Sequence, residues 1–166
     1  MIETIQLDPT KANLRKFTEF QVDLYAGNPY YVPPLVSDDV RTLSPKDNPA
    51  FDFCEAAYFM AFRDGRPAGR IAGIINHQVN ADSKRHNARF GFVDFIDDVE
   101  VSEALFKAVE DWARTRGMKR LIGPLGFTDL DHEGMLVEGF QELSTMATIY
   151  NYPYYPAHLE RLGFRK

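Results

Sequence analysis

The stretch FVDFIDDVEVSEALFKAVEDWARTRGMKRLIGP, residues 92–124, decides the fold class of this chain. Its apolar start predicts a strand, and its middle predicts an amphipathic helix. Apolar residues recur at the spacing of one helix face, at Leu105, Ala108, Val109 and Trp112. Gly117 then ends the helix, and a second short strand follows. A strand, a helix and a strand in this order predict one parallel crossover.

The junction in front of this helix is acidic. It holds Asp97, Asp98 and Glu100, and no Gly, Arg, Lys or Gln occurs between Phe92 and Ser102. Carboxylates at a helix N-terminus accept hydrogen bonds from its free N–H groups and stabilise it by about 0.3–1 kcal/mol each. We therefore interpret these residues as helix caps. A helix start that its own carboxylates fill is closed to an anionic cofactor.

The other segments add antiparallel strands to this crossover. A hairpin is predicted over residues 55–76, with its turn at Asp64-Gly65. Further strands are expected at residues 2–7, 90–96, 119–124 and 145–150, and further helices after residue 10, around residues 38–43 and before the "LGF" near the C-terminus. A polar excursion is expected over residues 77–89. The predicted fold class is α/β (α+β): a mixed, mostly antiparallel sheet flanked by helices, in one domain spanning residues 1–166.

Composition excludes several function classes. A net charge of -5 provides no excess of cations for binding nucleic acid or a membrane surface, so neither is expected as a partner. The apolar runs are only as long as strands, and the N-terminus lacks the features of a signal peptide. Cys54 is the only cysteine, so an intrachain disulfide is impossible. These features predict a cytoplasmic location.

Four stretches carry a resemblance to a known family. They are YVPPLVSDDVRTLSPKDNPAF, YFMAFRDGRPAGRIAGIIN, the stretch quoted first, and GMLVEGF with YNYPYYPAHLERLGF. Together they resemble a bacterial family of proteins with the Gcn5-related N-acetyltransferase (GNAT) fold and no assigned substrate. Members of that family are longer and carry a second GNAT-like half. The resemblance implies that this chain corresponds to the N-terminal half, and that a final strand after the "LGF" is missing.

The GNAT fold implies a sheet that splays open between its fourth and fifth strands, here residues 90–96 and 119–124. In active members, acetyl-CoA or another acyl thioester enters that gap. Its pantetheine arm pairs with the fourth strand and its pyrophosphate lies on the next helix. The resemblance thus assigns cofactor contacts to Phe95, Ile96, Asp97 and Asp98. Two like charges about 4 Å apart repel by roughly 4 kcal/mol, about a thousandfold in affinity, so this acidic start disfavours the usual pose.

The resemblance also implies a general acid, because many GNAT enzymes place a tyrosine on the last helix. Leu159 stands at that position here. Tyr152 and Tyr154 lie just before the helix and are candidates to protonate the leaving thiolate, as are Tyr150 and Tyr155. The alternative is that these tyrosines form a packing cluster, because tyrosine commonly buries its ring and keeps its hydroxyl wet.

The loop TDLDHEG, residues 128–134, holds the densest cluster of proton-transfer groups. Asp129, His132 and Glu133 are candidates for a general base toward an amine, or for binding a cationic substrate. The alternative is a solvated turn. No metal site is expected, because these residues lack a recognised ligand spacing.

Two hypotheses remain open from sequence. The first is an acyltransferase that moves an acetyl or other acyl group from a thioester to a small-molecule amine. The second is a non-catalytic GNAT-like module that packs on a second GNAT-like half or forms a homodimer. Because a fold does not determine a function, the residues of the site have to separate them.

Overall fold

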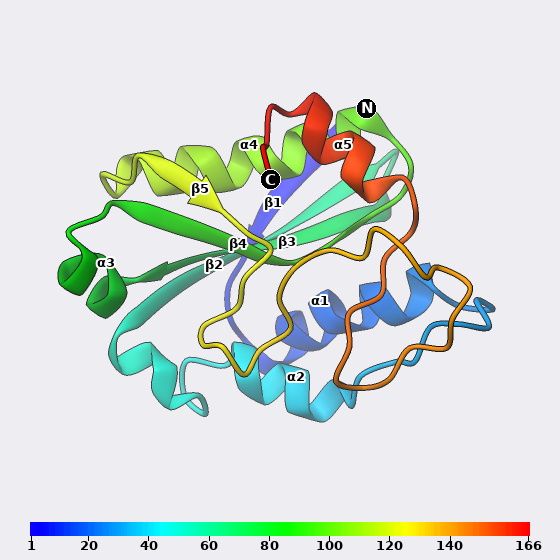
Figure 1. Cartoon of the computed structure of the whole chain (residues 1–166), viewed down its shortest axis with the longest axis horizontal. Coiled ribbons are helices and arrows are strands. Elements are labelled where there is room, and N and C mark those ends of the chain that lie inside the picture. The colour runs from blue at the N-terminus through cyan, green and yellow to red at the C-terminus, as the bar shows by residue number, and fades with distance from the viewer.

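The computed structural model describes residues 1–166 and contains a five-stranded sheet with helices on both faces (Figure 1). The elements in chain order are β1 (Ile2–Leu7), α1 (Lys11–Leu24), α2 (Val36–Leu43), a 3-10 turn (Pro49–Asp52), β2 (Cys54–Arg63), β3 (Arg66–Asn76), α3 (His77–Ser83), β4 (Asn87–Phe95), α4 (Val99–Thr115), β5 (Arg120–Ile122) and α5 (Tyr155–Arg161). None of these helices has the length and apolar character needed to cross a membrane.

The strands lie side by side in the order β1-β2-β3-β4-β5. Neighbours are antiparallel except β4 and β5, which are parallel and joined through α4. The hairpin between β2 and β3 turns at Asp64 and Gly65, both with positive φ, 51° and 78°. Two such residues in succession match the right-handed twist of the flanking strands. The predicted fold class, with its mixed and mostly antiparallel sheet, is confirmed.

The two faces of the sheet bury different helices. On β2, Tyr58 and Met60 lie in one cluster with residues of α1 and α2, whereas Phe59 and Ala61 lie in another with residues of α4. This is the alternation expected of a strand covered on both sides. At Gly73 an added Cβ would lie 2.8 Å from the Trp112 ring, so the missing side chain lets α4 approach β3 closely.

The sheet forks between β4 and β5. Only three residue pairs join these strands, from Asn87 with Arg120 to Arg89 with Ile122. One further bond follows, in which the Leu125 N–H donates to the Phe90 carbonyl at 2.8 Å. The φ of Phe92 is 46°, and after this residue β4 runs on without β5 beside it. We call this diverging region, bounded by residues 92–95 and the loop after β5, the fork.

Two segments differ from the sequence prediction. The strand expected over residues 145–150 is absent, and residues 123–154 form a long loop over the side that carries α1 and α2 (Figure 1). At the position of the expected strand, the Thr145 N–H donates to Thr148 Oγ1 at 2.8 Å, and such local bonds compete with a strand. The polar excursion after β3 contains the short helix α3, whose Val79 N–H donates to the Asn76 side chain at 2.9 Å. No strand follows α5.

Candidate functional site

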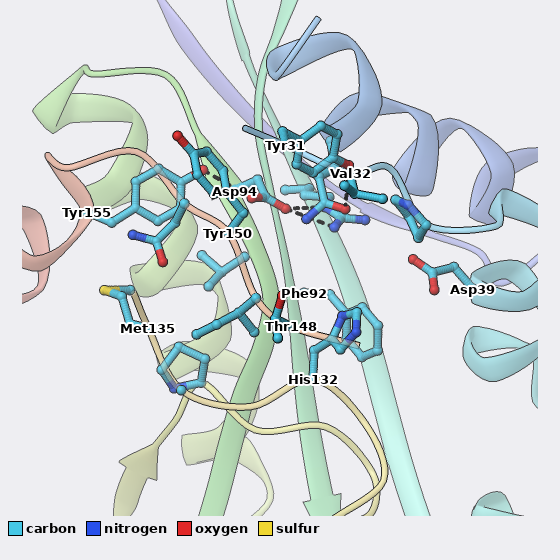
Figure 2. Close-up of a pocket in the computed structure, with 18 of the residues that line it drawn as sticks. Tyr31, Val32, Asp39, Phe92, Asp94, His132, Met135, Thr148, Tyr150 and Tyr155 are labelled. Carbon is cyan, nitrogen blue, oxygen red and sulfur yellow. Dashed lines mark hydrogen bonds and ion pairs between the residues drawn. The ribbon is translucent and has the colours of Figure 1, made fainter. Parts of the chain in front are cut away.

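A cavity of about 80 Å³ lies at the fork, and we call it the fork pocket. Its walls come from β3, β4, the segment between α1 and α2, and the long loop after β5. Figure 2 shows Tyr31, Asp39, His132 and Tyr155 arranged around it. A cavity needs only about 10–15 Å³ of such space to hold one water molecule, so the fork pocket accepts a small polar group but not a long chain.

The floor of the fork pocket is a buried ion pair. Arg70 Nε and Nη2 lie 2.9 and 2.8 Å from Asp94 Oδ2, with side chains only 2% and 3% exposed. Arg70 Nη1 donates to the Phe17 carbonyl of α1 at 3.1 Å. The hydroxyls of Tyr25 and Tyr155 donate to Asp94 Oδ1 at 3.2 and 3.1 Å. Burial raises the pKa of Asp94, and the charge of Arg70 opposes that rise. The pair fixes β3, β4 and α1 together beneath the pocket.

Asp39 and His132 supply titratable groups to the walls. Asp39 lies on α2 and is half-buried; burial raises the pKa of its carboxyl, against the pull of Arg70 and His132. His132 Nε2 lies 2.8 Å from the Met146 carbonyl oxygen. Since a carbonyl only accepts, Nε2 carries the proton, and in the neutral ring Nδ1 remains an acceptor. The charges of Arg70 and Asp94 balance each other, so the carboxylate of Asp39 adds a negative charge to the pocket. This charge favours a cation.

The start of α4 lies at the far end of β4. Asp98 is its N-cap and accepts from the Glu100 N–H at 3.0 Å, as the sequence predicted for a capping residue. Arg63, at the end of β2, donates through Nε to Asp98 Oδ2 at 2.8 Å and pairs through Nη2 with both Asp98 and Glu100. Partial burial raises the pKa of Asp98, but the hydrogen bond and charge of Arg63 outweigh it and hold that pKa below its usual range. The repulsion inferred from sequence is therefore softened by a cation from elsewhere in the chain.

Hydrogen bonds of His158 on α5 to Asp97 and Ser102 connect α5 to the start of α4, and we call this set of contacts the clasp. His158 Nε2 lies 2.9 Å from Asp97 Oδ1, and its Nδ1 lies 2.8 Å from Ser102 Oγ. Both His158 and Ser102 are buried, so these groups join two helices rather than face a cavity.

The edge of β4 is capped by tyrosines. The Tyr154 hydroxyl donates to the Phe95 carbonyl at 2.6 Å, and the Phe95 N–H donates to the Tyr155 hydroxyl at 3.2 Å. The Tyr152 hydroxyl donates to the Leu24 carbonyl at 3.1 Å. Burial raises the pKa of Tyr154 and Tyr155 well above the ordinary range, so both phenols stay protonated.

Solved structures identify the architecture. The chain superposes on a tandem GNAT protein of the clavulanic acid pathway with a TM-score of 0.63 and 15% identity, covering 98% of this chain and 43% of that one. This chain has the GNAT fold. A predicted acetyltransferase of Clostridium acetobutylicum, crystallised with acetyl-CoA, matches over 100% of this chain and 91% of its own, with a TM-score of 0.56 and 10% identity. No family model matches the sequence.

A curated relative is closer in sequence. The bacterial ceramide synthase of Caulobacter vibrioides is 33% identical over 158 residues, which is 95% of this chain and 41% of that protein. This chain therefore spans about two-fifths of the length of that relative. The region of similarity includes nearly all of the GNAT unit described above.

The GNAT fold brings together only some of the residues predicted from sequence. His132 lines the fork pocket, whereas Asp129 and Glu133 are exposed on the long loop outside it. Tyr152 and Tyr154 have hydroxyls committed to backbone carbonyls, which agrees with the packing-cluster alternative. Leu159, at the position of the usual GNAT tyrosine, is buried. No group of His, Cys, Asp or Glu side chains is arranged to hold a metal ion.

The residues of this GNAT unit do not fit acetyl-CoA in its usual place. Phe95 ends β4, and Ile96, Asp97 and Asp98 lie between this strand and α4. Their hydrogen-bonding groups, however, already have partners within the chain at Phe95, Asp97 and Asp98.

Three residues of the fork pocket escaped the sequence reasoning: Asp39, Arg70 and Asp94. A signal for two of them was present. Arg70 lies inside the apolar run AGRIAGIIN, and Asp94 lies inside GFVDFI. A charged residue inside an otherwise buried strand needs a partner of opposite charge, so each predicted the other. Asp39 carried no such signal, because it follows Asp38 on a short polar helix.

Proposed function

We propose that this chain is the amine-binding unit of an N-acyltransferase that joins an acyl group from acetyl-CoA or another thioester to an amine. The GNAT fold supports acyl transfer as the reaction class. The relative named bacterial ceramide synthase supports a fatty acyl group and a long-chain amine, because a ceramide contains an amide between the two. In this proposal the chain forms one GNAT-like half of a longer protein.

The observation that carries the proposal is the charge of the fork pocket. Asp39 faces it from α2, above the neutral Arg70–Asp94 pair, and an ammonium there would meet an unbalanced carboxylate. The ammonium has to lose a proton before its nitrogen can attack a thioester carbonyl. A carboxyl with a raised pKa is a stronger base than an exposed one, and the free Nδ1 of His132 is a second acceptor. We assign Asp39 to ammonium binding and His132 or Asp39 to the proton transfer.

Apolar side chains complete the pocket. Tyr31, Val32 and Pro34 line one wall, and Met135 and Met146 line another. The cavity is too small for a long chain, so a hydrocarbon tail would leave through the mouth. Met146 is 55% exposed there and offers an adaptable apolar surface.

Binding of a simple amine tests this assignment. We expect hexylamine to perturb the amide signals of Asp39 and His132 in a saturable titration, and hexanol, which lacks the charge, to bind at least tenfold more weakly. Asp39→Asn should lower hexylamine affinity about tenfold, which is 1.4 kcal/mol. Asp38→Asn is the matched control, because Asp38 is adjacent, exposed and outside the pocket. Equal effects of the two substitutions would refute the role of Asp39.

A second candidate function is favoured by the capped fork edge. A GNAT-like unit whose β4 edge and α4 start are already bonded internally resembles a scaffold that packs on a second GNAT-like half or on its own copy. Under this proposal the chain binds no amine at the fork pocket, and its mass by light scattering exceeds that of one chain or rises when the other half is added. Saturable hexylamine binding by a monomer would count against it.

A further inference from the structure

The start of α4 already holds an anion of the chain's own. A helix N-terminus binds phosphate when its N–H groups are free and point at the ligand. In α4 the Glu100 N–H instead donates to Asp98 at 3.0 Å, and Arg63 covers the same carboxylate. An incoming diphosphate would have to displace this ion pair and leave Asp98 without its two partners.

The edge of β4 beside it is occupied as well. A ligand that pairs with a strand edge needs a free carbonyl and a free N–H. Tyr154 and Tyr155 fill both positions at Phe95, with 2.6 and 3.2 Å between the bonded atoms. The ring of Tyr155 also stacks on that of Phe95, with centroids 4.5 Å apart. The tyrosine rings and hydroxyls therefore stand where an extended arm would run.

The two tyrosines are held in place by the clasp between α4 and α5. Tyr155 begins α5, and three residues later His158 reaches Asp97 and Ser102, at 2.9 and 2.8 Å. Moving the tyrosines away from β4 would break this clasp and also the bond from Tyr155 to the buried Asp94. The occupants are thus fixed by the core rather than by a mobile surface segment.

We infer that this chain holds no acyl-CoA at its fork, because its own side chains make both of the contacts that the thioester would make. Asp98 with Arg63 takes the place of the diphosphate, and Tyr154 with Tyr155 takes the place of the pantetheine arm. If the proposed acyl transfer holds, it follows that the thioester is bound by polypeptide outside these 166 residues and presented to the fork pocket.

Amide NMR of the unmodified chain tests this inference. The chain is titrated with CoA, acetyl-CoA and inorganic pyrophosphate to about 1 mM, the concentration at which weak binding of roughly -4 kcal/mol becomes visible. We expect no saturable shift of the amides of residues 95–102. A GNAT protein that binds acetyl-CoA, such as the Clostridium relative, serves as the positive control under the same conditions. Saturable shifts at residues 95–102, with a dissociation constant below about 1 mM, would overturn the inference.

The outcomes for the two proposals are separable. CoA that shifts no amide of residues 92–102 or of the fork pocket supports the inference, whereas saturable shifts of fork-pocket amides by CoA would overturn it. Hexylamine titrations report on the fork pocket independently, at Asp39 and His132. If the chain binds neither CoA nor hexylamine, the present inference is supported and the amine-binding proposal is refuted.

Discussion

Replacing Asp94 by Asn should destabilise the chain strongly. The substitution keeps the shape of the side chain and removes its charge, while Arg70 stays charged beneath the fork pocket with its side chain only 2% exposed. Arg70 would retain its bond to the Phe17 carbonyl, but no carboxylate would balance it. The tyrosine hydroxyls that donate to Asp94 would share one amide oxygen instead of a charged acceptor.

The magnitude follows from the burial of the pair. Removing one partner of a buried ion pair typically costs about 3–5 kcal/mol, because the other charge is left uncompensated. A domain of this size has about 5–15 kcal/mol of stability in total, so Asp94→Asn should remove a large part of it. Replacing both partners by apolar residues, Arg70→Met with Asp94→Leu, should cost much less, since the desolvation of both charges disappears.

Equilibrium unfolding in urea, followed by far-ultraviolet circular dichroism, measures both variants. Asp111→Asn is the matched control, because Asp111 also pairs with cations, Lys107 and Arg114, but on the exposed surface of α4. We expect the free energy of unfolding of Asp111→Asn to equal that of the wild type within measurement error. The reasoning fails if Asp94→Asn costs less than about 1 kcal/mol, or if the double variant is less stable than the single one.

Three further predictions follow from the same contacts. Asp98→Ala should cost about 0.5–2 kcal/mol by removing the cap, whereas Asp98→Asn keeps the cap and loses only the ion pair. Because the folded pKa of Asp98 lies below its ordinary value, its stabilising contribution is present above about pH 4 and is lost as the pH falls further. In urea unfolding from pH 7 to 3, the free energy of unfolding should therefore fall less for Asp98→Asn than for the wild type. An equal fall in both proteins would contradict the ion pair. Tyr155→Phe should cost about 1–3 kcal/mol through the unpaired groups that it leaves, against no measurable change for Tyr30→Phe, whose hydroxyl makes no hydrogen bond within the chain. Gly73→Ala should cost about 1–3 kcal/mol, because its Cβ would lie 2.8 Å from the α4 tryptophan; thermal unfolding with no loss would show that α4 can shift away.

The sequence predicted correctly those helices and strands whose turn residues, caps or apolar periods are visible over a few neighbouring residues. The hairpin followed from Asp64-Gly65, whose positive φ values only a few residue types adopt readily. The helix α4 followed from its apolar period and its acidic cap. The strand expected over residues 145–150 was wrong because alternation alone does not register the competing hydroxyl of Thr148.

The chemistry of the candidate site depends on pairings between distant segments. Arg63 reaches Asp98 only because the end of β2 and the start of α4 meet at one corner of the fold, 35 residues apart in sequence. Residues 92–102 themselves contain no Lys or Arg, so the sequence around the helix start gives no sign of this cation. The Arg70–Asp94 pair was predictable in kind, as two buried charges of opposite sign, but its position beneath a pocket required the register of β3 on β4.

Buried backbone groups need hydrogen-bond partners, and this need explains both the capped fork edge and the use of a GNAT fork as a binding site. A sheet that parts between β4 and β5 leaves backbone groups near Phe95 without a strand partner, and buried backbone groups have to be bonded. In a GNAT protein that binds a thioester, the ligand can supply those bonds. Here Tyr154 and Tyr155 supply them within the chain, and Asp98 does the same for the start of α4. Internal satisfaction stabilises the unliganded fold, but it removes the free groups that a ligand would use. With the fork edge satisfied in this way, the proposed amine chemistry depends on the fork pocket and on Asp39 in its wall.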